Sequence, residues 1–483
     1  MSKPLVFALL LVSTTWPLYS RAETQSVSCT QLMAWMAGGV SGERLARIVR
    51  ESRLDASVDQ DCARALKSAG AAGPLLEALG KPKKQPLSHP SCSPELVYAA
   101  ALAQQKEYAR EESQLRLLLR ADPGDAALHF ALGWALRQQE EWDDAFDEFT
   151  ESARLMPGLP ETHNQLSYLF YHLDDDDNAI AEARTALSID PKNAEGYRYL
   201  GLGLYAGGHY DAAIHVFIES LLRDANNPDT YYDMGITLRD QGDLRGAAIA
   251  YRHALQLDPN SWETHSNLGV VLHDQGKLDD AIAEYQQAKR LSPEEPSIRS
   301  NLGTTLCDKG DYDAAIAELR ELYQMNQDWT GGHSCLAKAL MAKHEYDAAI
   351  SELRLAVKNS PTSATDHRAL GQALLLVGRQ EEAVRELQTA VSLNPDSDMA
   401  HRYLGTALFQ LQRYAEAEKE FRQAVRLKSS GDNHYSLAAC LMVMDRYPEA
   451  LSELEIASHL DPAQTLYRAR KDELIKLMKS SPR

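Results

Sequence analysis

Residues 262–293, WETHSNLGVVLHDQGKLDDAIAEYQQAKRLSP, contain the pattern that decides the fold of this chain. Apolar residues recur at helical spacing from Leu268 to Leu272, and Gly276 then ends that pattern. A second apolar face runs from Ala281 to Ala288, before a closing proline. The stretch therefore predicts two short helices joined by a tight turn.

The same pattern returns ten times along the chain. A large apolar residue recurs every 34 positions, with a last interval of 33, at Leu132, Leu166, Leu200, Met234, Leu268, Leu302, Leu336, Leu370, Leu404 and Leu437. An alanine follows each of them at thirteen positions: Ala145, Ala179, Ala213, Ala247, Ala281, Ala315, Ala349, Ala383, Ala417 and Ala450. Small residues are needed where two helices cross closely, and isolated helix pairs must stack to bury their apolar faces. The sequence therefore predicts a stacked array of helix pairs.

This spacing, with its Leu-Gly, Ala and Pro positions, resembles the tetratricopeptide repeat family over about residues 92–464. The resemblance implies an all-α fold, an α-α superhelical solenoid of about eleven helix pairs. The unit at 92–125 is degenerate, because Glu111 stands where the alanine is expected. Residues 465–483 are expected to form a C-terminal capping helix over the last repeat.

The first 22 residues are typical of a secretory signal peptide. Lys3 precedes an apolar core from Leu5 to Val12, and the small residues Ser20 and Ala22 follow. We therefore expect an exported protein, periplasmic or secreted. No later segment reaches the roughly 20 apolar residues that a membrane-spanning helix needs.

Residues 23–80 predict a small helical module ahead of the repeats. Leu45, Ile48 and Val49 form one apolar helix face, which could dock on a membrane or a partner or could pack within the module. The second interpretation is favoured, because neighbouring segments are apolar enough to cover that face. Residues 81–91 are proline-rich and are expected to form a stiff linker.

The chain carries a formal net charge of −19 and six cysteines. Such a charge repels nucleic acids and anionic membranes and favours cationic partners, although acidic surfaces often serve only solubility. The cysteines are too sparse to build a fold and include no closely spaced pair, so neither zinc nor redox chemistry is indicated. Cys29 with Cys62 is the pairing that we expect.

No pattern in the sequence predicts catalysis. The histidine at one position of most repeats, as in ETHSNLG, is interpreted as a packing residue, because donors from successive parallel helices do not converge on one metal ion. The run Asp174–Asp177 is interpreted as a solvated turn that caps a helix. The repeats also look like those of O-linked N-acetylglucosamine transferases, but the transferase domain is absent. We expect no catalytic residue, metal or cofactor.

Tetratricopeptide arrays typically bind peptides in a groove lined by their first helices, and this resemblance supplies candidate partner-binding positions. In the N-terminal repeats these positions are aromatic and acidic: Tyr171, Tyr205, Asp240, Asp274 and Asp308. In the C-terminal repeats they are apolar and basic: Arg368, Leu375, Arg402, Phe409 and Met442. The aspartates are interpreted equally well as a site and as solvated surface.

The sequence thus predicts a non-enzymatic scaffold that binds a protein or peptide, and its acidity favours a basic one. A component that handles glycan or pilus polymers during export is an alternative. An accessory subunit of a separately encoded enzyme is another. The aromatic positions do not discriminate between them, because peptides and carbohydrates both stack on aromatic rings.

Overall fold

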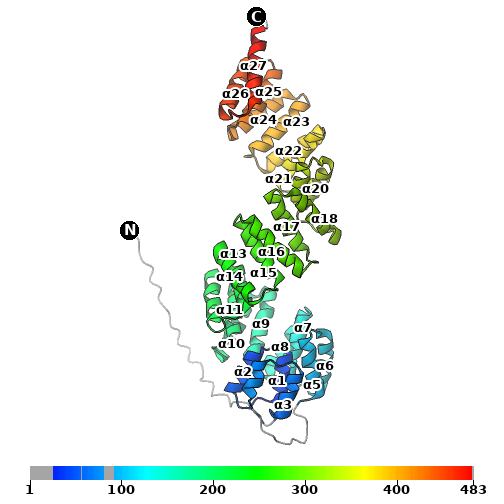
Figure 1. Cartoon of the computed structure of the whole chain (residues 1–483), viewed down its shortest axis with the longest axis vertical. Coiled ribbons are helices and arrows are strands. Elements are labelled where there is room, and N and C mark those ends of the chain that lie inside the picture. Colours follow the sequence, from blue (N-terminus) through cyan, green and yellow to red (C-terminus); the bar gives the residue numbers. More distant parts are fainter. Residues whose placement is uncertain (1–25, 56, 81–91, 481–483) are drawn as a thin grey trace, which may run out of the picture. The chain divides into compact units, whose positions relative to one another are not determined.

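The computed structural model describes residues 26–55, 57–80 and 92–480. These residues form 27 α-helices and no β-strand, with one isolated bridge between Val27 and Leu54 (Figure 1). The all-α repeat fold is therefore confirmed. The expected signal peptide (1–22) and linker (81–91) lie outside the described residues. The chain divides into two compact units, Met1–Gln241 (unit 1) and Gly242–Arg483 (unit 2).

Unit 1 begins with four short helices, which we call the N-terminal module: α1 (Cys29–Ala37), α2 (Gly42–Glu51), α3 (Gln60–Ser68) and α4 (Gly73–Leu79). Its repeat helices are α5 (Pro94–Gln104), α6 (Tyr108–Ala121), α7 (Ala126–Gln138), α8 (Trp142–Leu155), α9 (Pro160–His172), α10 (Asp176–Ile189), α11 (Ala194–Ala206), α12 (Tyr210–Leu221) and α13 (Pro228–Gln241). From α5 to α12, each odd-numbered helix packs against the helix that follows it.

Unit 2 continues the alternation with α14 (Leu244–Leu257), α15 (Trp262–Asp274), α16 (Leu278–Leu291), α17 (Pro296–Lys309), α18 (Tyr312–Met325), α19 (His333–Ala342), α20 (Tyr346–Asn359), α21 (Ala364–Leu376), α22 (Gln380–Leu393), α23 (Asp398–Gln410), α24 (Tyr414–Leu427), α25 (Gly431–Val443) and α26 (Tyr447–Leu460). The final helix, α27 (Thr465–Ser480), packs on α26 and buries Tyr467 and Leu474. No helix among the described residues is both long and apolar enough to cross a membrane.

Glycine and alanine make the close packing of each helix pair possible. A Cβ atom added to Gly269 on α15 would lie 2.7 Å from the ring of Tyr285 on α16, so only glycine lets the two helices approach this closely. Ala281, the recurring alanine of this repeat, is fully buried on α16. Gly276 ends the turn after α15 with a φ of 74°, in the left-handed region.

The N-terminal module shares one hydrophobic core with the first repeats. Helix α1 packs against both α5 and α7, and Gly38, just after α1, lies against the ring of Phe130 on α7. Leu45 and Val49, on the predicted amphipathic face of α2, are buried in the same core. The module is therefore a packed part of unit 1.

Glu111 is buried at the position where other repeats have alanine. It lies on α6, is 0% exposed, and neither of its carboxylate oxygens has a hydrogen-bond partner among the described residues. Burial raises the pKa of Glu111 to about 8. The degenerate first repeat thus keeps the helix pairing but contains a carboxyl group in its core.

Candidate functional site

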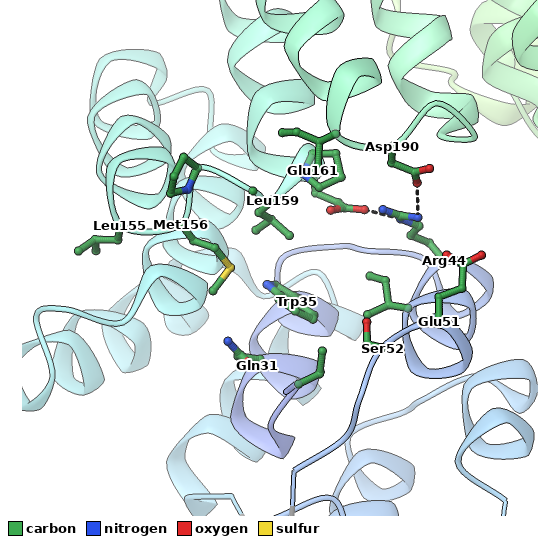
Figure 2. A pocket seen from close by; sticks show the side chains of 16 residues that line it. Gln31, Trp35, Arg44, Glu51, Ser52, Leu155, Met156, Leu159, Glu161 and Asp190 are labelled. Atoms are coloured by element: carbon green, nitrogen blue, oxygen red, sulfur yellow. Dashed lines mark hydrogen bonds and ion pairs between the residues drawn. The ribbon is translucent and has the colours of Figure 1, made fainter. Parts of the chain in front are cut away.

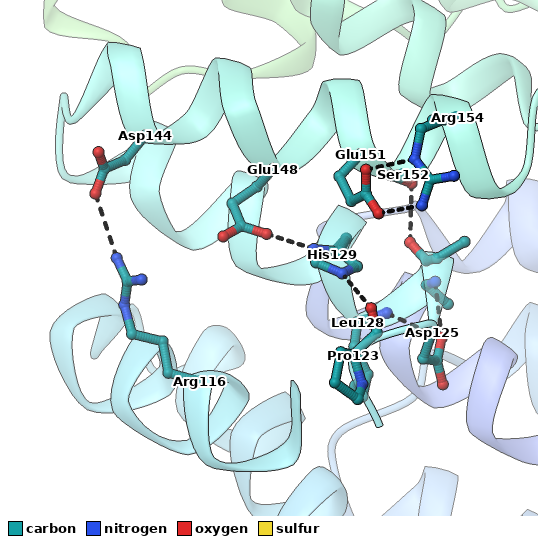
Figure 3. Close-up of polar contacts among 12 residues, drawn as sticks. Arg116, Pro123, Asp125, Leu128, His129, Asp144, Glu148, Glu151, Ser152 and Arg154 are labelled. Carbon is teal, nitrogen blue, oxygen red and sulfur yellow. Dashed lines mark hydrogen bonds and ion pairs between the residues drawn. The ribbon is translucent and has the colours of Figure 1, made fainter. Parts of the chain in front are cut away.

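The recurring histidine forms a hydrogen-bonded rung between the two helices of its repeat (Figure 3). His129 Nδ1 lies 2.5 Å from Glu148, and its Nε2 lies 3.1 Å from the carbonyl oxygen of Pro123. The same histidine–glutamate contact occurs at seven repeats, always nineteen residues apart: His129, His163, His265, His333, His367, His401 and His434.

Both ring nitrogens of the His129 rung face hydrogen-bond acceptors, so the protonated imidazolium suits the site best. The hydrogen bond to Glu148 raises the pKa of His129 against the opposing effect of burial. The hydrogen bond to Glu420 likewise raises the pKa of His401. The histidines therefore serve to join helices.

The sequence contained the signal for these rungs. The glutamate nineteen positions after the histidine is kept where the first position is basic and is absent where Tyr197 replaces the histidine. Tyr197 replaces a histidine and is followed at that distance by Val216. Arg299 replaces another and keeps the acid, forming a 3.1 Å ion pair with Glu318. Comparing the two positions across the repeats would have revealed the pairing.

The odd-numbered helices α7, α9, α11 and α13 carry aromatic and charged side chains, among them Trp134, Tyr168, Tyr171, Arg198, Tyr205 and Asp233. We call the side of these helices that carries Tyr171 and Tyr205 the first-helix surface of unit 1. The Arg137 guanidinium lies 3.9 Å from the ring centre of Tyr168 and 4.7 Å from that of Trp134. The Arg198 guanidinium donates to Asp233 at 2.6 Å. Because each of these cations already has partners within the chain, neither offers a free charge to a ligand.

Two sequence-predicted tyrosines come together on this surface. Tyr171 on α9 and Tyr205 on α11 line one pocket of about 380 Å³, together with His172, Asp174, Asp176 and Ala206. We call it the Tyr171–Tyr205 pocket. An adjacent pocket of about 610 Å³ is lined by Asp174–Asp177, Ile180, Gly207 and His209.

The acids around this pocket differ in their roles. Asp175 caps α10 by accepting a hydrogen bond from the Asn178 amide, as the turn interpretation predicts. In the described part of the chain, no basic side chain forms an ion pair with Asp174 or Asp176. The pocket therefore combines tyrosine rings with uncompensated negative charge, which suits a cation.

Asp240 is the third predicted residue in unit 1. It accepts a 2.6 Å hydrogen bond from the hydroxyl of Tyr205 and a 3.0 Å hydrogen bond from Arg239. Burial and the bond to Asp240 raise the pKa of Tyr205, so this hydroxyl remains a donor. Asp240 therefore orients one wall of the Tyr171–Tyr205 pocket.

Asp274 and Asp308 lie in unit 2, each in the last turn of its helix. Asp308 accepts from Lys338 at 3.2 Å, and His273 lies between the two carboxylates, at 3.5 Å from Asp274 and 3.2 Å from Asp308. Their charges are thus partly offset within the chain. Asp274 and Asp308 thus share His273 as a partner, whereas Asp240 belongs to unit 1.

The predicted C-terminal positions lie on α21, α23 and α25 of unit 2: Arg368, Leu375, Arg402, Phe409 and Met442. All five are half-buried. The three apolar ones pack against the core of unit 2, and the Phe409 ring lies 5.4 Å from that of Tyr414. Beside them, Leu376 and Val443 are 52% and 48% exposed.

A larger cavity of about 780 Å³ lies between the N-terminal module and the repeats of unit 1 (Figure 2). Trp35, Ile48 and Leu159 are among its apolar lining residues. At one side Arg44 pairs with Glu161 and, at 2.6 Å, with Asp190. These ion pairs fix the module to the start of α9 and to the residue that follows α10, and no pattern in the sequence indicated them.

Within the described residues, one group of at least three possible metal ligands is close enough to hold an ion: Cys29, Cys62 and Cys92. The expected partner of Cys29 was Cys62, but Cys29 lies within disulfide reach of both other cysteines. Sequence spacing did not indicate that Cys92 would join them. The remaining cysteines, Cys307, Cys335 and Cys440, are free thiols.

Two protein-family models match the chain, and both are described as tetratricopeptide repeat. One matches residues 232–296, 300–364, 335–388 and 368–432, and the other matches residues 160–193. No curated protein matches.

Among solved structures, the chain is similar to one described as "Functional Characterization of Pseudomonas Aeruginosa pilF", with 19% identity, a TM-score of 0.40, and coverage of 44% of this chain and 97% of that one. It is also similar to MamA of Desulfovibrio magneticus RS-1, with 20% identity, a TM-score of 0.33, and coverage of 35% and 95%. A chain of the Cut9–Hcn1 complex shares 12% identity, with a TM-score of 0.43 and coverage of 92% and 99%.

Proposed function

We propose that this tetratricopeptide repeat protein is a non-enzymatic scaffold that binds a peptide segment of a partner protein on the first-helix surface of unit 1. Proteins of this family generally mediate protein–protein interactions. In the proposed complex, a lysine or arginine side chain of the partner enters the Tyr171–Tyr205 pocket. The proposal involves no catalytic step.

The composition of the Tyr171–Tyr205 pocket carries this proposal. A cation over a tyrosine face gains about 0.5–2 kcal/mol, more when water is excluded. Asp174 and Asp176 add electrostatic attraction, and no cation of the described chain neutralises them. Tyr205 is held in place by its hydrogen bond to Asp240, so the pocket is ordered before a ligand arrives.

Selection from a random peptide library displayed on phage tests the proposal, because it needs no identified partner. We expect selected peptides to share one basic position, and replacement of that residue by norleucine to weaken binding. Binding should also weaken with added salt, because the attraction is electrostatic. Selected peptides with no basic position would contradict the proposal.

Matched variants distinguish a local pocket from the general acidity of the chain. Tyr171→Ala and the double variant Asp174→Asn/Asp176→Asn should lose the preference for the basic position. The control Asp279→Asn/Asp280→Asn removes two charges from the start of α16 in unit 2 and should keep the preference. Equal loss in both double variants would show that net charge alone governs binding.

We also propose that the protein is exported. The proposal rests on the sequence of residues 1–22, with its early lysine, apolar core and small residues before the expected cleavage after Ala22. N-terminal sequencing of the protein isolated from its native cells tests it. A mature chain that still begins at Met1 would contradict export by this signal.

A further inference from the structure

Three cysteines that are distant in sequence meet where three helices of unit 1 begin. Cys29 is the first residue of α1, Cys62 is the third residue of α3, and Cys92 lies two residues before α5. Their exposed fractions are 0%, 0% and 7%, and their sulfur atoms all lie within 4.8 Å of one another. The group joins the N-terminal module to the first repeat.

Cys29 is the common member of the two possible pairs. Its Cα atom lies 5.8 Å from that of Cys62 and 6.1 Å from that of Cys92. Both distances fall in the range of about 4.4–6.8 Å that disulfides occupy. A cysteine forms only one disulfide, so one of the two partners must remain a thiol whenever the other is bonded.

We propose that Cys29, Cys62 and Cys92 form a thiol–disulfide exchange site in which Cys29 alternates between the other two. The Cys92 thiolate attacks Sγ of Cys29, a Cys29–Cys92 bond forms, and the Cys29–Cys62 bond breaks. The electron pair of the broken bond stays on Cys62, which takes up the proton that Cys92 lost. The step changes no net oxidation state and requires no further oxidant.

The helix starts beside the three sulfurs favour the thiolate that this chemistry needs, whereas burial in the hydrophobic core opposes its formation. The thiolate is the attacking species in exchange, and the positive end of a helix dipole favours it. Here the starts of three helices converge, each at least nine residues long. The cysteines also belong to the hydrophobic core of the module, so solvent thiols reach them less readily than they reach one another.

Exchange would change which segments of the chain the disulfide joins. The Cys29–Cys62 bond links α1 to α3 within the module and closes a separation of 33 residues. The Cys29–Cys92 bond links α1 to the start of α5 and closes a separation of 63 residues. The second isomer therefore ties the module covalently to the first repeat, whereas its ion pairs contact α9 and the residue after α10.

A structural zinc site is the less favoured interpretation of the same cluster. Structural zinc is almost always held by four protein ligands. Among the described residues, only the three cysteines belong to the group, with no histidine or carboxylate completing it. Zinc binding is therefore an outcome that the experiment must be able to detect.

Peptide mapping of the purified full-length chain tests the proposal. The protein is equilibrated in a buffer of reduced and oxidised glutathione, which supplies the two-electron oxidation that forms the first disulfide. It is then quenched with acid, alkylated and digested with trypsin. Lysine and arginine residues place the three cysteines on separate tryptic peptides, so mass spectrometry distinguishes the linkages.

We expect both Cys29–Cys62 and Cys29–Cys92 peptides, with the alkylated thiol on Cys92 in the first isomer and on Cys62 in the second. Similar geometry predicts a ratio within about tenfold, which corresponds to about 1.4 kcal/mol. Cys62→Ser should move all of Cys29 into the bond with Cys92, and Cys92→Ser should do the reverse. The wild-type mapping stands even where a variant folds poorly.

Two results would overturn the proposal. One is a single linkage in the wild-type protein, with the other isomer below a tenth of the total. The other is one equivalent of zinc bound by the reduced wild-type protein and lost in Cys29→Ser, with the cysteines resisting oxidation. Either result would show that the three cysteines form a fixed disulfide or a zinc site and do not exchange.

Discussion

Replacing Glu111 by glutamine should stabilise the protein, and the gain should grow with pH. Glu111 is fully buried on α6 without a hydrogen-bond partner among the described residues, so its charged form is strongly disfavoured in the folded state. Burial raises its pKa from 4.5 to about 8. In Glu111→Gln the volume is nearly unchanged, and the titrating group is gone.

The magnitude follows from the difference between the folded and unfolded pKa values. Between pH 4.5 and about 8 the unfolded chain releases the proton of Glu111 while the folded chain retains it. Stability therefore falls with pH over this window, by about 1.4 kcal/mol per pH unit, and levels off above it. The cost in the wild type reaches roughly 3 kcal/mol at pH 7 and roughly 5 kcal/mol above pH 8.

Urea denaturation of both proteins at about pH 5, 7 and 9, followed by circular dichroism, measures this cost as a difference. Hydrogen exchange in α5 to α8 locates it, because repeat arrays need not unfold in one step. Glu77→Gln, an exposed change in the module, is the control and should show no such trend. A difference between Glu111→Gln and wild type that is the same at all three pH values would refute the reasoning.

Three further changes test the packing of the repeats and the module. His401→Gln should cost about 1.5–3 kcal/mol near pH 6, the strength of a hydrogen bond to a charged group. The substitution should cost less near pH 9. The stability that a histidine of raised pKa contributes is fully present below its unfolded pKa of about 6.5 and is lost as pH rises through its pKa in the folded protein. Equal costs at the two pH values in urea titrations would contradict this. Arg44→Met should cost about 3–5 kcal/mol by leaving the buried carboxylate of Glu161 without its cation, seen as lost hydrogen-exchange protection in α1 and α2, and full protection would count against it. Gly269→Ala should cost about 1–3 kcal/mol through its contact with the facing tyrosine ring, whereas Gly158→Ala, with nothing within 4 Å, should leave the urea midpoint unchanged.

The repeat fold could be predicted because its determinants are local and recur. The leucine that follows the rung histidine and the alanine at the helix crossing are both buried in repeat after repeat, as with Leu268 and Ala281. The turn glycine Gly276 also adopts the left-handed conformation that ends α15. Each of these features depends on residues within one repeat, so periodicity alone reveals it.

Contacts between distant segments could not be predicted in this way. Arg44 and Glu161 are separated by 117 residues, and neither position looks unusual in its own segment. The proximity of Cys92 to Cys29 depends on how the module packs against α5, which no spacing of cysteines encodes. Such contacts are set by the folded core and become visible only with it.

In the candidate site, too, features within one repeat could be predicted and contacts between repeats could not. The family resemblance pointed to Tyr171 and Tyr205, and the structure places both on one pocket. The acids Asp174 and Asp176 of the capping turn line that pocket as well, which the turn interpretation did not predict. Local pattern explained the cap at Asp175, but the neighbouring acids belong to a surface formed by two repeats.

The histidine rung has a consequence for how such a chain can change length during evolution. Its glutamate lies nineteen residues after the histidine and its carbonyl acceptor six residues before it, so the whole interaction fits inside one 34-residue period. An unequal crossover that inserts or deletes one period therefore transfers donor and both acceptors together. A crossover point outside the segment from the carbonyl acceptor to the glutamate therefore leaves no rung histidine and no rung glutamate without its partner at the new junction. Gain or loss of a repeat can thus occur in a single genetic event without requiring a compensating mutation elsewhere in the gene.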